Sequence, residues 1–120
     1  MAELLVIEKD PWGGPYAHLA RQRVADPSEL AGAWVVVLAG PRAADQKHVT
    51  EAFRAARDLG VKLAVLRVDE PGQEVWFDAL EERAQVPRTL GVRDGAVVVD
   101  LPGARPASVI ASKLRDAGLR

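Results

Sequence analysis

A run of apolar residues in the first third of the chain leads straight into a Gly-Pro turn. Residues 34–38 read Trp-Val-Val-Val-Leu without a polar interruption, and Ala39-Gly40-Pro41-Arg42 follows. An unbroken apolar run of this length is typical of a strand that is covered on both faces of its sheet. Residues 45–59 then place apolar side chains at helical spacing, at Val49, Ala52, Phe53 and Ala56. A buried strand that turns directly into an amphipathic helix predicts an α/β architecture.

Apolar runs and helical spacings alternate along the rest of the chain. The predicted strands cover residues 4–7, 34–38, 61–68, 89–92 and 96–101. The predicted helices cover residues 16–24, 45–59, 74–84 and 106–117. Asp45 is the predicted N-cap of the second helix, Gly60 follows its end, and Asp94-Gly95 is a strong hairpin signal between the last two strands. The order β-α-β-α-β-α-β-β-α predicts one domain over residues 1–120, with a central mixed sheet flanked by helices.

Composition and charge argue against several classes of function. The net charge of −1 gives no overall electrostatic attraction for nucleic acid or for an anionic membrane. No apolar run approaches the roughly 20 residues that a membrane helix needs. Residues 1–8 are too short and too acidic for a signal peptide, so a cytoplasmic location is expected. The chain has no asparagine, one methionine and twelve arginines against four lysines, which is a thermophile-like composition.

The residue types also limit the chemistry that the chain can perform. It has no cysteine, which excludes disulfides, thiol catalysis and thiolate metal sites. His18 and His48 are its two histidines, too few for a histidine-based metal site. We therefore predict no metal and no cofactor. No nucleophile, base and orienting group can be assembled from these residues, which favours a binding protein over an enzyme.

The second half of the chain resembles thioredoxins. The stretch from Pro87-Arg88-Thr89 to Gly103-Ala104 is similar, without gaps, to their Pro-Thr, strand, turn, Gly, strand, Gly-Ala sequence. The resemblance implies a thioredoxin-like fold in which Pro87 is a cis-proline facing the active-site turn. It also implies that Ala39-Gly40-Pro41-Arg42 stands where thioredoxins carry Cys-Gly-Pro-Cys. Because thiol–disulfide exchange needs a thiolate, that activity cannot be present.

A second resemblance covers the middle of the chain. Residues 26–32, 59–61 and 68–71 are similar to peroxiredoxins of the alkyl-hydroperoxide-reductase and thiol-specific-antioxidant (AhpC-TSA) branch. Their Pro-x-x-x-Thr/Ser-x-x-Cys motif, counted from Pro41, puts Asp45 at the hydroxyl position and His48 at the peroxidatic cysteine. Counting by helix length instead puts Arg42 at the buried cysteine of thioredoxins. The peroxiredoxin alignment and the thioredoxin alignment of this turn both stay open.

The resemblance implies a candidate binding face where redox relatives hold their substrates. It comprises Gly40, Pro41, Arg42, Lys47, His48, Pro87 and Arg88. We expect a protein or peptide partner there. Alternatively, the four basic residues bind a phosphate-like anion, or make an enzyme, at the helix N-terminus that follows Pro41. A homodimer through exposed apolar parts of the last two helices is a further possibility.

A different class of function follows from the first strand. Residues 4–10 resemble the first strand of Toprim domains, which carries a glutamate, here Glu8. Those domains also need Asp-x-Asp at the end of a later strand to hold magnesium. This chain has Arg67-Val68-Asp69-Glu70 instead. The alternative is therefore a degenerate Toprim-like domain associated with nucleic acid, although the net charge leads us to expect no nucleic-acid partner.

Overall fold

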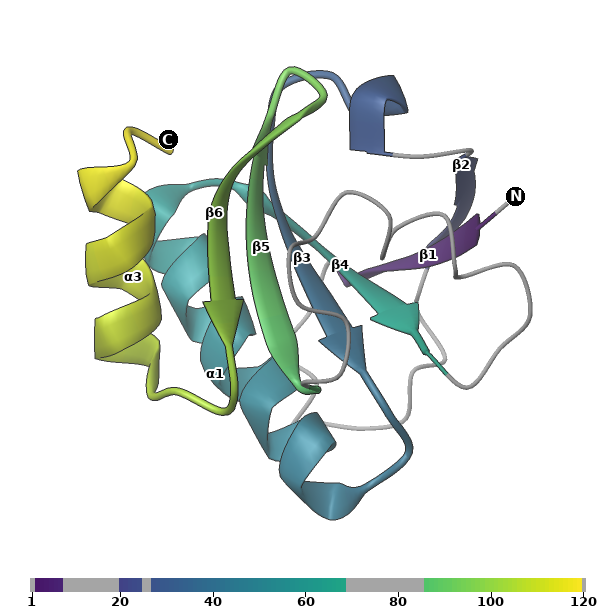
Figure 1. Ribbon diagram of the computed structural model, residues 1–120, viewed down its shortest axis with the longest axis vertical. Helices are drawn as coiled ribbons and strands as arrows, with labels where there is room; N and C mark the ends of the chain where they lie inside the picture. Colours follow the sequence, from purple (N-terminus) through teal and green to yellow (C-terminus); the bar gives the residue numbers. More distant parts are fainter. Residues whose placement is uncertain (1, 8–19, 25–26, 69–85, 120) are drawn as a thin grey trace.

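Six strands make one mixed sheet in the computed structural model, which describes residues 2–7, 20–24, 27–68 and 86–119. The strands are β1 (Ala2–Ile7), β2 (Ala20–Val24), β3 (Ala33–Ala39), β4 (Lys62–Arg67), β5 (Arg88–Arg93) and β6 (Ala96–Pro102). Their order across the sheet is β2-β1-β4-β3-β5-β6. Two α-helices, α1 (Ala43–Leu59) and α3 (Ala107–Asp116), and a short 3₁₀ helix, η3 (Pro27–Glu29), complete the described elements (Figure 1).

β3 lies in the interior of the sheet, as its apolar sequence predicts. It pairs in parallel with β4 and antiparallel with β5. Val35 and Val37 face one hydrophobic core, and Val36 and Leu38 face a second core. All four side chains are fully buried. The strand therefore has neither a free edge nor a polar face.

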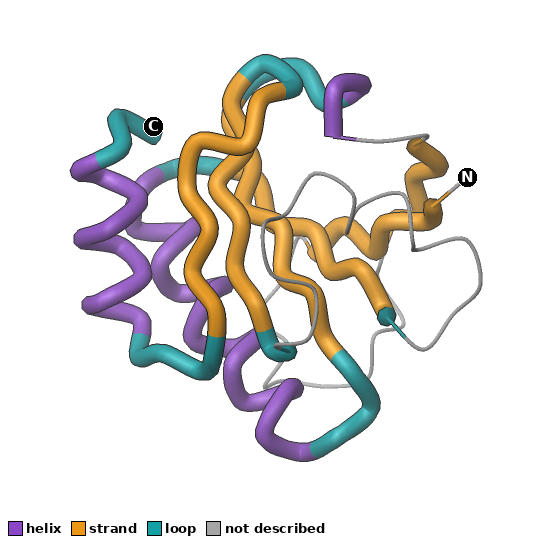
Figure 2. Tube along the Cα trace, viewed as in Figure 1, coloured by secondary structure: helices purple, strands orange, loops and turns teal. Residues whose placement is uncertain are grey.

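The helices α1 and α3 pack against each other beside the sheet, as the coiled ribbons in Figure 1 and the purple tubes in Figure 2 show. Their apolar side chains join the core that contains Val35 and Val37. In α1, Val49, Ala52 and Ala56 are buried, which confirms the predicted stripe, and Phe53 is partly buried against it. Neither described helix is both long and apolar enough to span a membrane.

The predicted first helix is wrong over residues 20–24, which form β2. This strand pairs antiparallel with β1, from Ala2 opposite Val24 to Val6 opposite Ala20. Local helical spacing is a weak signal, and the hydrogen bonds available along the open edge of β1 outweigh it. The predicted order β-α-β-α-β-α-β-β-α therefore has a strand where its first helix was expected. The predicted third helix, residues 74–84, lies outside the described residues.

The β5–β6 hairpin forms as its Asp-Gly sequence predicts. Asp94 and Gly95 both have positive φ, 47° and 84°, which a two-residue hairpin turn requires. The Asp94 N–H donates to the Gly32 carbonyl at 2.9 Å, and the Gly32 N–H donates to Asp94 Oδ1 at 3.0 Å. The tip of the hairpin is thus fastened to the segment that leads into β3.

Gly91 lets α3 approach β5 closely. A Cβ at this position would lie 3.0 Å from Leu114, 3.2 Å from Val99 and 3.3 Å from Leu119. The pairing of β5 with β6 also shifts between Gly91 and Val92, so that Val98 is an extra residue in β6. Val98 is 43% exposed, whereas the side chains around Gly91 belong to the core.

We expect Gly91→Val to destabilise the protein, because the new side chain has no space between the sheet and α3. Overpacking of this kind costs about 1–3 kcal/mol in the free energy of unfolding. Urea unfolding would measure it. Val98→Ala, in the neighbouring strand but exposed, is the control and should change the value by less than about 0.5 kcal/mol. Equal effects of the two substitutions would contradict this account of the packing.

Candidate functional site

The turn at the end of β3 lies beside the segment that precedes β5. β3 ends at Ala39, the turn Gly40-Pro41-Arg42 follows, and α1 begins at Ala43. The peptide bond between Val86 and Pro87 is cis. Arg42 joins the two segments, because its Nη2 donates to the Val86 carbonyl at 2.8 Å. The Gly-Pro turn and the cis-proline segment, which the resemblance to thioredoxins places side by side, are therefore in contact.

Asp45 holds the Arg42 side chain in this position. Its carboxylate accepts hydrogen bonds from the Arg42 Nε at 3.1 Å and Nη2 at 3.2 Å, and from the Arg42 backbone N–H at 3.3 Å. The Asp45 side chain is fully buried, whereas that of Arg42 is 63% exposed. The prediction of Asp45 as N-cap is wrong: Arg42 is the N-cap, and Asp45, three residues later, satisfies the N–H of Arg42.

The Asp45 carboxylate also explains the glycine at position 40. A Cβ on Gly40 would lie 2.9 Å from Asp45 Oδ2, closer than a real side chain approaches. The carboxylate therefore occupies the space at the end of β3 where a larger residue would stand. It supplies the negative charge that the N-terminus of a helix favours, so the helix end at Pro41 is already compensated.

His48 is buried, and both of its ring nitrogens are engaged. Its side chain is 1% exposed, its Nε2 lies 2.5 Å from Thr89 Oγ1, and its Nδ1 accepts the Arg105 backbone N–H at 3.1 Å. Since Nδ1 is an acceptor, the ring is the neutral tautomer that carries its proton on Nε2 and donates it to Thr89. Burial lowers the pKa of His48 below its usual value of 6.5. His48 therefore adds no positive charge to the predicted face.

Arg88 is also absent from the surface of the predicted face. Its side chain is 3% exposed and makes a two-pronged ion pair with Asp100 on β6, at 2.5 Å through Nε and 2.6 Å through Nη2. Asp100 lies opposite Leu90 in the sheet register, diagonal to Arg88. Opposite charges at diagonal positions of a hairpin attract each other. The hairpin predicted from Asp94-Gly95 is the sequence signal from which the pairing of Arg88 with Asp100 could have been predicted.

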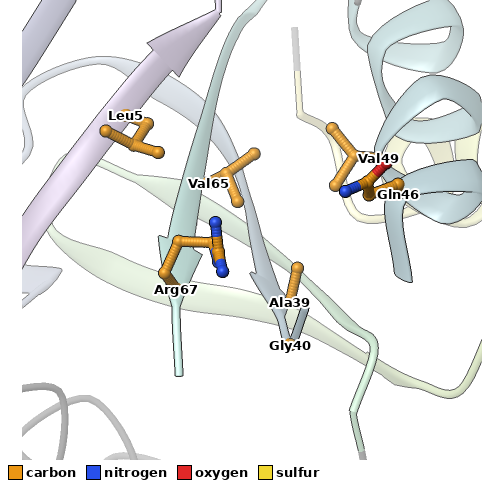
Figure 3. A pocket seen from close by; sticks show the side chains of 7 residues that line it. All are labelled: Leu5, Ala39, Gly40, Gln46, Val49, Val65 and Arg67. Atoms are coloured by element: carbon orange, nitrogen blue, oxygen red, sulfur yellow. The ribbon is translucent and has the colours of Figure 1, made fainter. Parts of the chain in front are cut away.

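Two hollows flank the first turns of α1. The smaller encloses about 10 Å³, lies between the end of β4 and α1, and is lined by Leu5, Ala39, Gly40, Gln46, Val49, Val65 and Arg67 (Figure 3). That volume holds at most a single water molecule. The larger, which we name the Arg105 hollow, measures about 320 Å³ and lies between α1 and the connection from β6 to α3. It is lined by Ala44, Lys47, His48, Glu51, Ala104, Arg105 and Pro106.

The structure therefore divides the predicted face. Gly40, Pro41, Arg42 and Pro87 meet around the Arg42–Val86 contact, and we name these four residues with Val86 the Pro41–Pro87 face. Of the other three predicted residues, Lys47 and His48 line the Arg105 hollow. Arg88 is buried on β5, where it pairs with Asp100 of β6.

Several predicted elements of other sites are not placed. His18 and the carboxylates of the Toprim-like alternative, Glu8, Asp69 and Glu70, lie outside the described residues. Within the described ranges, no group of three or more histidine or acidic side chains could hold a metal ion. Sequence reasoning missed the parts played by Thr89, Arg105 and Asp100. Thr89 and Arg105 contact His48 across 41 and 57 residues, whereas Asp100 pairs with Arg88 across the predicted hairpin.

Comparisons with known proteins define the fold. No protein-family model matches the chain, and no curated protein matches it in sequence. Its structure is similar to the crystal structure of thioredoxin from Aeropyrum pernix, with a TM-score of 0.66 over 97% of this chain and 94% of that chain. The two sequences are 17% identical, so the likeness concerns the fold alone. The protein has a thioredoxin-like fold, as its sequence predicts, and contains no cysteine.

We expect acid to destabilise the protein through His48. Well above pH 6.5 the ring is neutral in both the folded and the unfolded chain, and it adds little pH dependence. As the pH falls below 6.5 the unfolded chain takes up the proton first, because burial lowers the folded-state pKa. The free energy of unfolding should then fall by up to about 1.4 kcal/mol per pH unit, until the folded-state pKa is reached.

Urea unfolding between pH 8 and pH 5 would test this expectation. His48→Asn is the control, because asparagine does not titrate and can still accept the Arg105 N–H. The variant should lose the part of the pH dependence that comes from His48. The same pH dependence in the two proteins would show that His48 is not the titrating group.

Proposed function

We propose that the protein is a non-redox thioredoxin-like domain that binds a protein or peptide partner through the Pro41–Pro87 face. The absence of cysteine excludes thiol–disulfide exchange and cysteine-based peroxidase activity. The turn and the cis-proline segment nevertheless still meet, through the Arg42–Val86 contact. The surface formed by these two segments is therefore retained without a cysteine, which suits binding rather than catalysis.

The observation that carries this proposal is the fixed position of an exposed arginine. Arg42 is mostly exposed, yet it is held by Asp45 and by the Val86 carbonyl, which belongs to a segment 44 residues away. An exposed arginine normally loses side-chain freedom when a partner binds. Arg42 has lost much of that freedom already, so its cost of binding is reduced. Arginine is also among the residues that contribute most to interfaces, and the exposed Pro41 adds rigid apolar area beside it.

The other functions receive less support. A phosphate-like anion at the Pro41 turn would meet a helix end that Asp45 already neutralises. A homodimer through α3 would need free apolar surface, but Ile110, Ala111 and Leu114 are buried. The Toprim-like alternative rests on carboxylates outside the described residues. A cytoplasmic location and a peroxiredoxin-like origin remain expectations from the sequence.

We expect Arg42→Glu to weaken partner binding, because it reverses the charge of the arginine that Asp45 and Val86 hold on the Pro41–Pro87 face. The immobilised protein would be incubated with an extract of its native host, and the retained proteins quantified by mass spectrometry. Each retained candidate would then be purified and titrated by calorimetry. A true partner should bind Arg42→Glu at least about tenfold more weakly than the parent, the usual effect of losing a central interface arginine.

Arg54→Glu provides the matched control. Arg54 lies on the same helix, is 44% exposed and makes a comparable ion pair three residues back, with Glu51 at 3.0 Å. It should therefore retain the partner, and thermal melting would verify that both variants fold. Equal affinity of the partner for the parent and Arg42→Glu, or equal losses in both variants, would refute the Pro41–Pro87 face as the binding site.

A further inference from the structure

The Arg105 hollow is a second candidate site, independent of the Pro41–Pro87 face. One wall is the solvent side of the first turns of α1, and the other is the connection from β6 to α3. Its volume of about 320 Å³ lies at the lower end of the range for small-molecule pockets. Three of its lining residues, Ala44, Ala104 and Pro106, present small apolar surfaces.

The charges in this hollow are predominantly positive. Lys47 is exposed, and its ammonium has no carboxylate partner among the residues that the structure describes. The Arg105 guanidinium contacts the Pro102 carbonyl through two long hydrogen bonds, both 3.4 Å. Glu51 is the acidic residue of the lining, and Arg54 already pairs with it at 3.0 Å. Lys47 and Arg105 therefore line the hollow, and neither forms an ion pair with a carboxylate of the described residues.

Hydrogen bonds hold the backbone of the hollow in place. The Arg105 N–H donates to His48 Nδ1, and the His48 ring is in turn bonded to Thr89 in β5. This chain of contacts ties the β6–α3 connection to α1 and to the sheet. A ligand would therefore meet walls that are already in place.

We propose that the Arg105 hollow binds a small organic phosphate monoester. A phosphate monoester carries a charge near −2 at neutral pH, which matches one ammonium and one guanidinium, whereas a single carboxylate would match only one. The phosphate group lies between Lys47 and Arg105, and the organic group covers Ala104 and Pro106. Because the volume exceeds what phosphate alone fills, the organic group adds contacts and affinity.

The test is a titration with inorganic phosphate and with glycerol phosphate, followed by the backbone amide signals in ¹H–¹⁵N NMR spectra. Chloride keeps the ionic strength constant, because screening alone changes surface electrostatics. We expect saturable shifts at residues 104–108 and 44–51, with tighter binding of glycerol phosphate. Lys47→Gln and Arg105→Gln should each weaken binding by about tenfold, since each removes a charge-assisted hydrogen bond. The double variant should show no saturation.

Lys113→Gln is the matched control, because Lys113 is an exposed lysine in the last turn of α3, away from the hollow. It should bind as the parent does. Arg105→Gln keeps the backbone N–H that bonds to His48, so loss of the fold is not expected, and thermal melting would verify this. The absence of saturable shifts, equal affinity of the parent and the double variant, no gain from the glycerol group, or shifts centred on residues 40–42 would each overturn the proposal.

Discussion

The complete burial of β3 is the constraint on which the rest of the structure depends. A strand with neighbours on both edges and a core on both faces can leave the sheet only at its ends. Its carboxyl end must pass at once into solvent-exposed chain, and Pro41 and Arg42 are the exposed residues that begin it. This exit sets where α1 starts and brings the turn beside Val86. The position of the Pro41–Pro87 face thus follows from the packing of a single apolar strand.

Ion pairs and hydrogen bonds within the fold determine which charges remain at the turn that follows β3. Asp45 neutralises Arg42, Asp100 neutralises Arg88, and His48 is held uncharged between Thr89 and the Arg105 backbone. Buried or partly buried charges need such partners, because the cost of removing them from water is otherwise large. Most of the basic residues that the sequence suggests at the Pro41 turn therefore have partners within the fold. Lys47 and Arg105, which form no ion pair among the described residues, line the Arg105 hollow instead.

The two proposed sites share one structural support, the first turns of α1. The side facing Val86 presents a fixed arginine beside a proline, which suits a large partner with a shaped surface. The side facing α3 presents a hollow lined by Lys47 and Arg105, which suits a small anion. Neither proposed site needs a thiol, so both are compatible with a thioredoxin-like fold that contains no cysteine.

The sequence by itself determined the features that local chemistry encodes. The apolar run of β3, the stripe of α1 and the Asp-Gly hairpin depend on residues within a few positions of each other, and all three form as predicted. Tertiary structure alone decided that residues 20–24 pair with β1, and that His48 and Arg88 turn inward. His48 meets Thr89 across 41 residues and Arg105 across 57. Periodicity shows which face of an element is apolar, but the partner of a buried polar group is known only once distant segments have packed together.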